Sequence, residues 1–210
     1  MHALDHLFVF CDQGAPEQEL LAEIGLRVGV RREHVGQGTA NACFGFANAY
    51  LELLWLQDEA AARDPMVKPL GLQERARWRH TNASPFGICV RPEPPGQEPP
   101  FVSWDYQPAY LPKDLPIRMA CNSGVIGEPL VFAVDRPFQP LPVAHALASA
   151  RLVRAVVTVV DLAPMSLLRD VVVPGLSIRS GDAPLMELTF EPARGHRLDL
   201  RPRLPLVLHC

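Results

Sequence analysis

The distribution of proline is the feature that most constrains the fold of this chain. There are 22 prolines in 210 residues, about twice the average share of roughly 5%, and they are concentrated between Pro85 and Pro142. Proline lacks a backbone donor and interrupts helices, so this density excludes long helices there and favours loops, turns and edge strands. We therefore expect a protein built mainly of strands, with a proline-rich loop in its middle.

Residues 1–58 predict a module with the order β-α-β-β. The segment "LDHLFVFC" (4–11) has the alternation of a strand, and "ANACFGFAN" (40–48) and "AYLELLWLQD" (49–58) predict two more. Between them, "APEQELLAEIGLRV" (15–28) has apolar residues at helical spacing after an acidic first turn. A further short strand is expected near residues 27–31.

The C-terminal residues repeat this order of elements. A strand is expected over 152–160, a short helix over 163–173, a strand over 175–181, and two more strands over 184–192 and 196–208. Superposing the two ends places His6 on Ala155 and Glu52 on Asp199. We expect a duplication in which modules 1–58 and 151–210 pair their sheets. Residues 59–150 would then supply a connecting helix, extra strands and the proline-rich loop.

Composition excludes several functional classes. The net charge of −3 and pI near 6.2 argue against nucleic-acid binding, which needs clustered Lys and Arg. No apolar stretch reaches the roughly 18 residues of a membrane span, and the N-terminus lacks the pattern of a signal peptide. The five cysteines are scattered, without CxxC, which predicts reduced thiols and a cytoplasmic protein. Hydrolase motifs such as HExxH and GxSxG are absent from the sequence.

Two polar residues stand in otherwise apolar strand rows. Residues two apart in a strand share a face, so Glu52 shares a face with Tyr50, and His6 with Phe8. An imidazole and a carboxylate on one apolar face would suit a ligand cup or half of a site for a divalent metal. The alternative is structural: His6 bonded to backbone and Glu52 paired with an arginine such as Arg118.

Two loops contribute further candidate residues. "HVGQGTAN" (34–41) lacks the Lys-Ser/Thr pair of a phosphate loop and precedes a strand, so it favours a tight turn fixed by polar side chains. "FVSWDYQPAYLP" (101–112) carries three aromatic residues that either contact a ligand at a pocket mouth or pack outside the sheet. The candidate ligand-binding residues are His34, Asn41, Tyr50, Trp104, Tyr106 and Tyr110.

The order of elements resembles a known superfamily. With "LDHLFVF" first and "AYLELLWL" last, the module is similar to those of the vicinal oxygen chelate superfamily of glyoxalases, extradiol dioxygenases and fosfomycin-resistance proteins. Within it, "REHVGQGTANACFGFANAYLELLWL" (32–56) most resembles the glyoxalase-like domain, with its His, Gly-Thr-x-Asn step and "YLEL" strand. The resemblance implies an α+β fold of paired βαβββ modules that forms a sheet-lined cup, in a monomer or homodimer.

The resemblance also implies a metal site, from which this sequence departs. In the superfamily one ligand comes from the first strand and one from the last strand of each module, which makes His6 and Glu52 the ligands of the first module. In the second, Ala155 cannot bind a metal and Asp199 lies among arginines. If the segment 84–92 is instead the strand that pairs with the first module, the residue at the ligand position is Phe86, which cannot bind a metal either.

The ligand set for Zn, Mn, Fe or Ni is therefore incomplete, and a site without metal stays open. Catalytic zinc sites normally have three protein ligands. The candidates for a third ligand are His34, His80 and Glu128.

Two functions follow from this interpretation. The first is an enzyme, a lyase, isomerase or dioxygenase of the glyoxalase-like type, in which His6 and Glu52 are catalytic and act on a small carbonyl or vicinal-oxygen molecule. The alternative is a binding, resistance or sequestration protein without metal, in which Glu52 anchors the ligand in the same cup. In both, the partner is a small molecule and neither nucleic acid nor a membrane.

Overall fold

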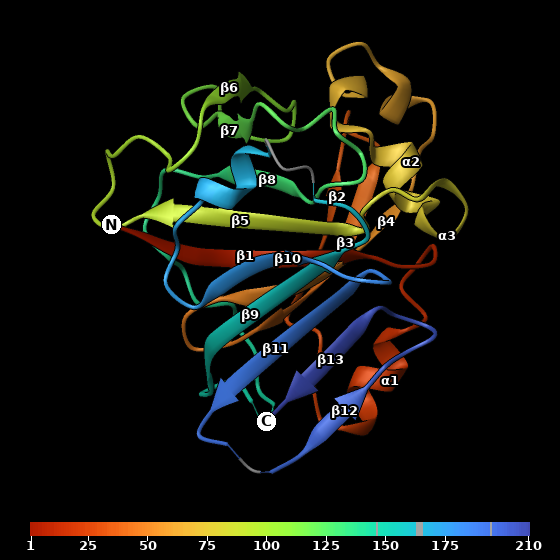
Figure 1. The fold of residues 1–210 in the computed structure, drawn as a ribbon, viewed down its shortest axis with the longest axis vertical. Helices are drawn as coiled ribbons and strands as arrows, with labels where there is room; N and C mark the ends of the chain where they lie inside the picture. The colour runs from red at the N-terminus through yellow and green to blue at the C-terminus, as the bar shows by residue number, and fades with distance from the viewer. Residues whose placement is uncertain (146, 163–165, 194) are drawn as a thin grey trace.

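Two β-sheets dominate the computed structural model, which describes residues 1–145, 147–162, 166–193 and 195–210 (Figure 1). The first sheet has eight strands in the order β2-β3-β4-β1-β5-β8-β7-β6, and the second has five in the order β10-β9-β11-β13-β12. The strands of the first sheet are β1 (His2–Phe10), β2 (Val30–His34), β3 (Thr39–Gly45), β4 (Tyr50–Leu56), β5 (Phe86–Pro92), β6 (Ser103–Tyr106), β7 (Ile117–Ala120) and β8 (Leu130–Ala133). Those of the second are β9 (Arg151–Val159), β10 (Leu176–Ser180), β11 (Leu185–Glu191), β12 (Arg197–Asp199) and β13 (Leu206–His209).

The eight-stranded sheet consists of two halves with the same strand order. In the first half β1 is parallel to β4, and in the second β5 is parallel to β8. The halves join where β1 and β5 pair antiparallel. This is the α+β arrangement of paired modules that the sequence predicted.

The second half of this sheet is supplied by residues 86–133, whereas the sequence analysis expected residues 151–210 to pair with the first module. The expected superposition of the two chain ends also fails, because β1 and β4 are neighbours whereas β9 and β12 are separated by β11 and β13. Ala155 lies in the core and Asp199 forms ion pairs with Arg197 and Arg201. Local alternation identifies strands but not their partners, which explains the difference. The division into 1–58, 59–150 and 151–210 as domains stays a prediction.

Alternation along the strands gives the large sheet two buried faces. In β1, Leu7 and Val9 belong to one apolar cluster, whereas Phe8 and Phe10 belong to another on the opposite face. The first cluster includes Met186 and other residues of the second sheet, so the two sheets pack face to face. The second cluster lines the concave face of the large sheet, which we call the cup.

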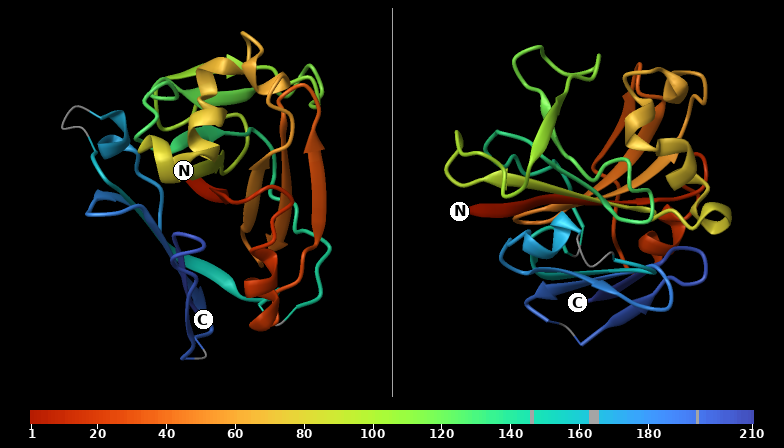
Figure 2. Two further views of the ribbon diagram at one scale, coloured as in Figure 1. Left: turned by 90° about the vertical axis from the view of Figure 1, so that its right-hand side faces the viewer. Right: turned by 45° about the horizontal axis from the view of Figure 1, so that its top comes forward.

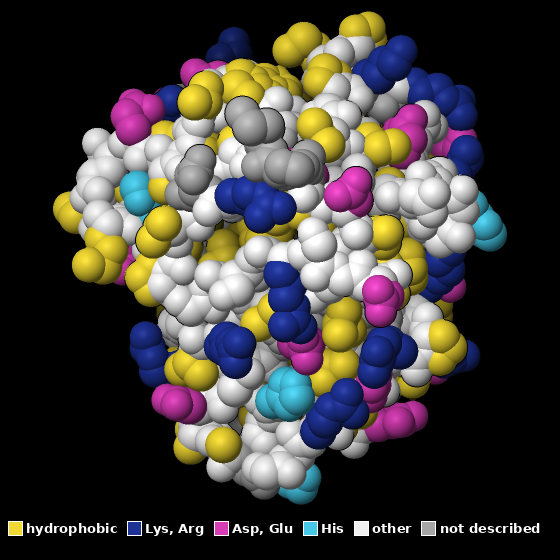
Figure 3. All heavy atoms as spheres, in the orientation of Figure 1, with side chains coloured by type: hydrophobic (Ala, Val, Ile, Leu, Met, Phe, Trp, Pro, Cys, Tyr) yellow, Lys and Arg dark blue, Asp and Glu magenta, His cyan; other side chains and the backbone are white. Residues whose placement is uncertain are grey.

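The C-terminal strands form a layer behind the strands of the first module (Figure 2). Because their inner side is packed into the shared core, their outer side faces solvent and is polar. Arg, Asp, Glu and His side chains are spread over this face (Figure 3).

The helices are short, and none of those in the described residues lies between Pro85 and Pro142, where the proline density predicts no long helix. α1 (Gln18–Glu23) is shorter than the helix expected over 15–28, and Gly25, with φ of +82°, follows its end. The connecting helix expected within residues 59–150 is present in broken form, as α2 (Leu72–Ala76) and α3 (Trp78–Thr81). Two 3₁₀ turns precede it, at Ala61–Arg63 and Lys68–Leu70. Of the helix expected over 163–173, residues 163–165 lie outside the described residues, and Leu167–Asp170 forms a 3₁₀ turn.

Within the described part of the chain, no helix is long and apolar enough to cross a membrane. The five cysteines, all of them within the described residues, form no disulfide bond.

Candidate functional site

A cavity of about 550 Å³ occupies the cup, a volume that suits a drug-sized organic molecule. Most of its wall is apolar and comes from both halves of the sheet and from the α2 region. The apolar and aromatic lining residues are Phe8, Leu54, Leu70, Leu72, Tyr106, Tyr110, Leu111, Ile117, Met119, Leu130, Phe132 and Val134. The polar lining residues gather on the first half: His6, Arg32, Glu33, His34, Gln37, Tyr50 and Glu52, with Arg136 following β8.

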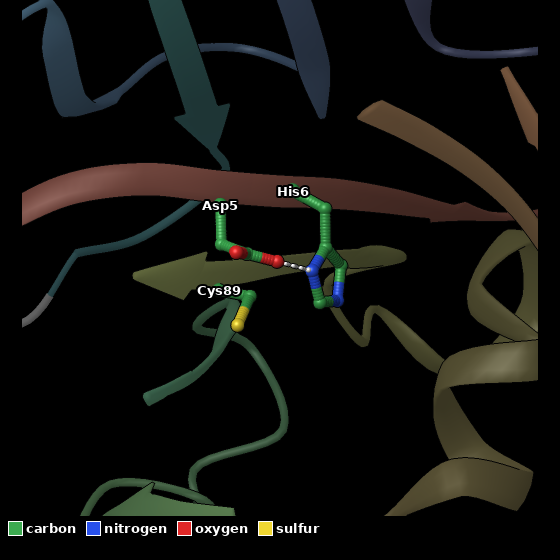
Figure 4. Close-up of side chains that lie close together, drawn as sticks. All are labelled: Asp5, His6 and Cys89. Carbon is green, nitrogen blue, oxygen red and sulfur yellow. Dashed lines mark hydrogen bonds and ion pairs between the residues drawn. The ribbon is translucent and has the colours of Figure 1, made fainter. Parts of the chain in front are cut away.

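His6 is held by its neighbour in the chain. The register of β1 against β5 shifts between Leu4 and His6, so that Asp5 is an extra residue in β1. As a result the Asp5 carboxylate reaches the imidazole, with Oδ1 2.7 Å from Nδ1 (Figure 4). An Asp bonded to Nδ1 fixes the imidazole and leaves Nε2 directed at the cavity. The His6 ring also stacks on Tyr50, with 4.4 Å between centroids.

Asp5 is one of the most deeply buried acids of the site. Burial by itself raises its pKa, but the hydrogen bond with His6 and the charges of His6, Arg136 and Arg91 outweigh this and lower the pKa below its ordinary 3.8. Asp5 therefore stays ionised.

Glu52 lies beside His6 at the floor of the cavity. Its Oε1 is 3.9 Å from Nε2 of His6 and 3.8 Å from the sulfur of Cys43, and the residue is 6% exposed. Burial raises the pKa of that thiol, so Cys43 is a weak neutral donor. Among the described residues no arginine or lysine lies within 4.0 Å of the Glu52 carboxylate. Arg118, the alternative partner, pairs instead with Glu98 and Asp105.

His34 and Tyr110 close one side of the cup. Their rings stack at 4.7 Å, and the Tyr110 hydroxyl donates to Gln37 at 3.3 Å. Nδ1 of His34 lies 2.8 Å from the Thr39 hydroxyl, and Nε2 lies 3.4 Å from the Asn41 amide. Burial lowers the pKa of His34, which keeps it neutral at pH 7.

The structure brings most of the predicted site residues together. His6, His34, Tyr50, Glu52, Tyr106 and Tyr110 all line the cavity. Asn41 lies behind His34, with its Oδ1 buried and unpartnered among the described residues. Trp104 is outside the cavity lining and donates from its indole nitrogen to Ser123. Of the other metal candidates, His80 is exposed on α3 and Glu128 is bonded to Asn122.

The donor groups of the site do not fit a firmly bound divalent metal. His6 and Glu52 provide two donors, and the ring nitrogens of His34, the third candidate, already face Thr39 and Asn41. The cavity-lining residues of the second half include Leu130 and Phe132, which are not ligands. Asp5, His6 and Cys89 also lie close together (Figure 4), but burial raises the pKa of the Cys89 thiol well above its usual range. Thiolate is the form that binds metals.

The charges around Asp5 also argue against a bound metal cation. Arg91 and Arg136 lie 3.8 Å and 4.0 Å from its carboxylate oxygens, and their positive charges oppose a further cation there.

Asp5, Arg32 and Arg136 are among the polar residues of the site that were not found from the sequence. Asp5 was missed because strict alternation places it on the opposite face from His6, and only the register shift brings the two together. Arg32 and Arg136 were missed because strand pattern does not distinguish an arginine at a cavity mouth from one in solvent. The one available signal for Arg32 was its position two residues before His34, on the same row of β2.

The cup is built of two halves of like strand order, the arrangement that the resemblance to the vicinal oxygen chelate superfamily implies. Residues 4–98 match the glyoxalase-like domain family. The resemblance inferred from the sequence motifs is confirmed over these residues. No protein of curated function matches the chain.

Several solved structures are similar to this chain at low sequence identity. A hypothetical protein from Staphylococcus aureus is 11% identical, with a TM-score of 0.53, over 100% of this chain and 99% of that chain. A methylmalonyl-CoA epimerase in complex with methylmalonyl-CoA is 17% identical, with a TM-score of 0.42, over 71% and 99%. The Streptomyces coelicolor methylmalonyl-CoA epimerase, bound to 2-nitronate-propionyl-CoA, is 17% identical, with a TM-score of 0.39, over 63% and 95%.

Proposed function

We propose that this protein binds a small carbonyl compound in the cup and moves a proton on the carbon beside the carbonyl group, as an isomerase or lyase does. The observation that carries the proposal is Glu52, a buried carboxylate at the cavity floor that, within the described residues, has no cationic partner closer than His6. A carboxylate in that setting can accept a proton from a bound molecule without first breaking an ion pair.

His6 supports the same chemistry as the acid that complements the base Glu52. Glu52 would take the proton from carbon, leaving an enolate, and His6 in its protonated form would return a proton to that carbon or to the oxygen. Asp5 favours this role because it holds Nδ1 and stabilises the imidazolium. No step requires a metal, in keeping with the donor set.

The carbonyl oxygen of the ligand, which gains negative charge in the enolate, also has a hydrogen-bond donor in the site. Tyr50 lies on the same row of β4 as Glu52, and its side chain is hydrogen-bonded to Arg136. Burial raises the pKa of Tyr50 well above 10.0, so the phenol stays protonated and can donate. Such a donor stabilises an enolate in a site that excludes water.

The test is deuterium exchange in D₂O, followed by NMR with 4-phenyl-2-oxobutanoate, whose C3 hydrogens lie beside the ketone. We expect the native protein to catalyse exchange and Glu52→Gln to slow it about 10²- to 10⁴-fold. Binding, measured as a shift of the melting temperature, should remain. Glu33→Gln is the control, because Glu33 lines the same cavity but lies on the outward row of β2.

Three results would contradict the proposal. Exchange that is unchanged in Glu52→Gln would remove the carboxylate from the chemistry. Stoichiometric Zn, Mn, Fe or Ni that is lost in Glu52→Gln would show a metal site instead. Binding without exchange by the native protein would support the alternative of a metal-free binding protein.

A further inference from the structure

The cup has a charged edge that proton transfer does not use. In β2, Arg32 pairs with Asn41 and His34 with Thr39, so Arg32 and His34 lie on the cup-facing row. The arginine is exposed at the cavity mouth and lines the cavity. Among the described residues no carboxylate lies within 4.0 Å of its guanidinium, which donates to the sulfur of Cys43 at 3.8 Å.

Most other arginines close to the cup are already paired. Arg136 is hydrogen-bonded to Tyr50 and lies 4.0 Å from Asp5, and Arg91 pairs with Glu93 at 2.8 Å. Arg118 has two acidic partners. Arg32 is thus the cavity-lining guanidinium with an open donor fork, and guanidinium forks bind carboxylates in bidentate fashion.

The remainder of the cavity requires an apolar body. Beyond the polar residues of the first half, the wall is formed by Leu54, Phe8, Phe132 and further aliphatic side chains. Burial of apolar ligand surface there is favourable by about 25 cal/mol per Å². A simple inorganic anion would leave this wall without contacts.

We propose that the ligand of the cup is an organic acid with an apolar body, whose carboxylate binds Arg32 while its carbonyl-bearing carbon lies near Glu52. This assignment names the substrate class of the site described under the proposed function and rests on that function for the role of Glu52. The positive charge of Arg32 also offsets the repulsion between the ligand's carboxylate and Glu52.

The experiment is calorimetric binding of 4-phenylbutanoate and of its neutral amide, 4-phenylbutanamide, to the native protein and two variants. Native protein should bind the acid roughly 10- to 100-fold more tightly than the amide, as expected for a charge-assisted hydrogen-bonded pair. Arg32→Gln should remove that preference and leave amide binding unchanged.

Arg31→Gln is the matched control. Arg31 is the adjacent residue of the same strand, pairs with Ala42 on the row facing the other way, and stacks 5.7 Å from the centroid of Trp55. It carries the same charge but should not affect the preference.

Equal binding of acid and amide by the native protein would overturn the assignment, as would equal losses in Arg31→Gln and Arg32→Gln. Neither probe undergoes the proposed reaction, so these results are independent of turnover. If the earlier test shows no deuterium exchange, the proposed role of Glu52 fails. The preference for acid over amide then still decides whether Arg32 binds a carboxylate.

Discussion

At the scale of single residues, the site depends on one irregularity in a strand. The extra residue in β1 lets the consecutive side chains of Asp5 and His6 meet, which regular alternation forbids. His6 and Glu52 could be predicted because a polar residue in an apolar row is visible in the sequence. Asp5 could not, because its orientation depends on the pairing of β1 with a strand some 80 residues later.

Asp5→Asn tests the energetic role of this contact. The folded-state pKa of Asp5 lies below the ordinary 3.8, so its charge contributes stability that is fully present above about pH 3.8 and is lost as the pH falls through the folded value. We expect Asp5→Asn to lower the free energy of unfolding by roughly 1–3 kcal/mol at neutral pH. The difference from the native protein should shrink below about pH 4.

The measurement is urea unfolding at a series of pH values. Asp12→Asn is the control, since Asp12 is a mostly exposed acid whose ion pair with Arg79 is worth at most about 1 kcal/mol. A difference for Asp5→Asn that stays constant down to about pH 3 would rule out the ionised carboxylate as its source.

At the scale of elements, the sequence predicts strands well and their pairing poorly. The strands β1, β3 and β4 follow from alternation within each segment. The pairing of β1 with β5 does not, since it depends on how surfaces fit. Phe86, the position considered for a ligand, lies in the core cluster on the opposite side of the sheet from the cup.

The contact of β1 with β5 explains why residue 87, next to Phe86, is a glycine. Gly87 pairs with Phe8, and a Cβ at Gly87 would lie 1.9 Å from Cε1 of that ring. We expect Gly87→Ala to lower the free energy of unfolding by roughly 1–3 kcal/mol, as overpacking does. It should also weaken ligand binding, because Phe8 lines the cavity.

Gly124→Ala provides the comparison, because a Cβ there meets no atom within 4 Å. Its effect should stay within about 0.5 kcal/mol in chemical unfolding. If Gly87→Ala were as mild, Phe8 would not be fixed against β5.

At the scale of the whole molecule, the second sheet is part of one structural unit with the first. Phe46, directly after β3, and Phe190 in β11 have rings that lie 4.5 Å apart. The turn between β3 and β4 is also tied to β9, since Asn48 accepts from the Leu152 amide at 2.8 Å and donates to its carbonyl at 3.0 Å. The C-terminal strands thus support the back of the sheet whose front forms the cup.

Met186→Ala tests whether this shared core makes unfolding cooperative. Met186 is 0% exposed in β11, so its truncation should lower the free energy of unfolding by about 2–5 kcal/mol. The three tryptophans, Trp55, Trp78 and Trp104, all belong to the part of the chain before the second sheet. Because the core is continuous, tryptophan fluorescence and far-UV circular dichroism should show the same lowered midpoint. A fluorescence transition that stays at the native midpoint while the circular dichroism shifts would show that the second sheet unfolds separately and leaves the cup intact.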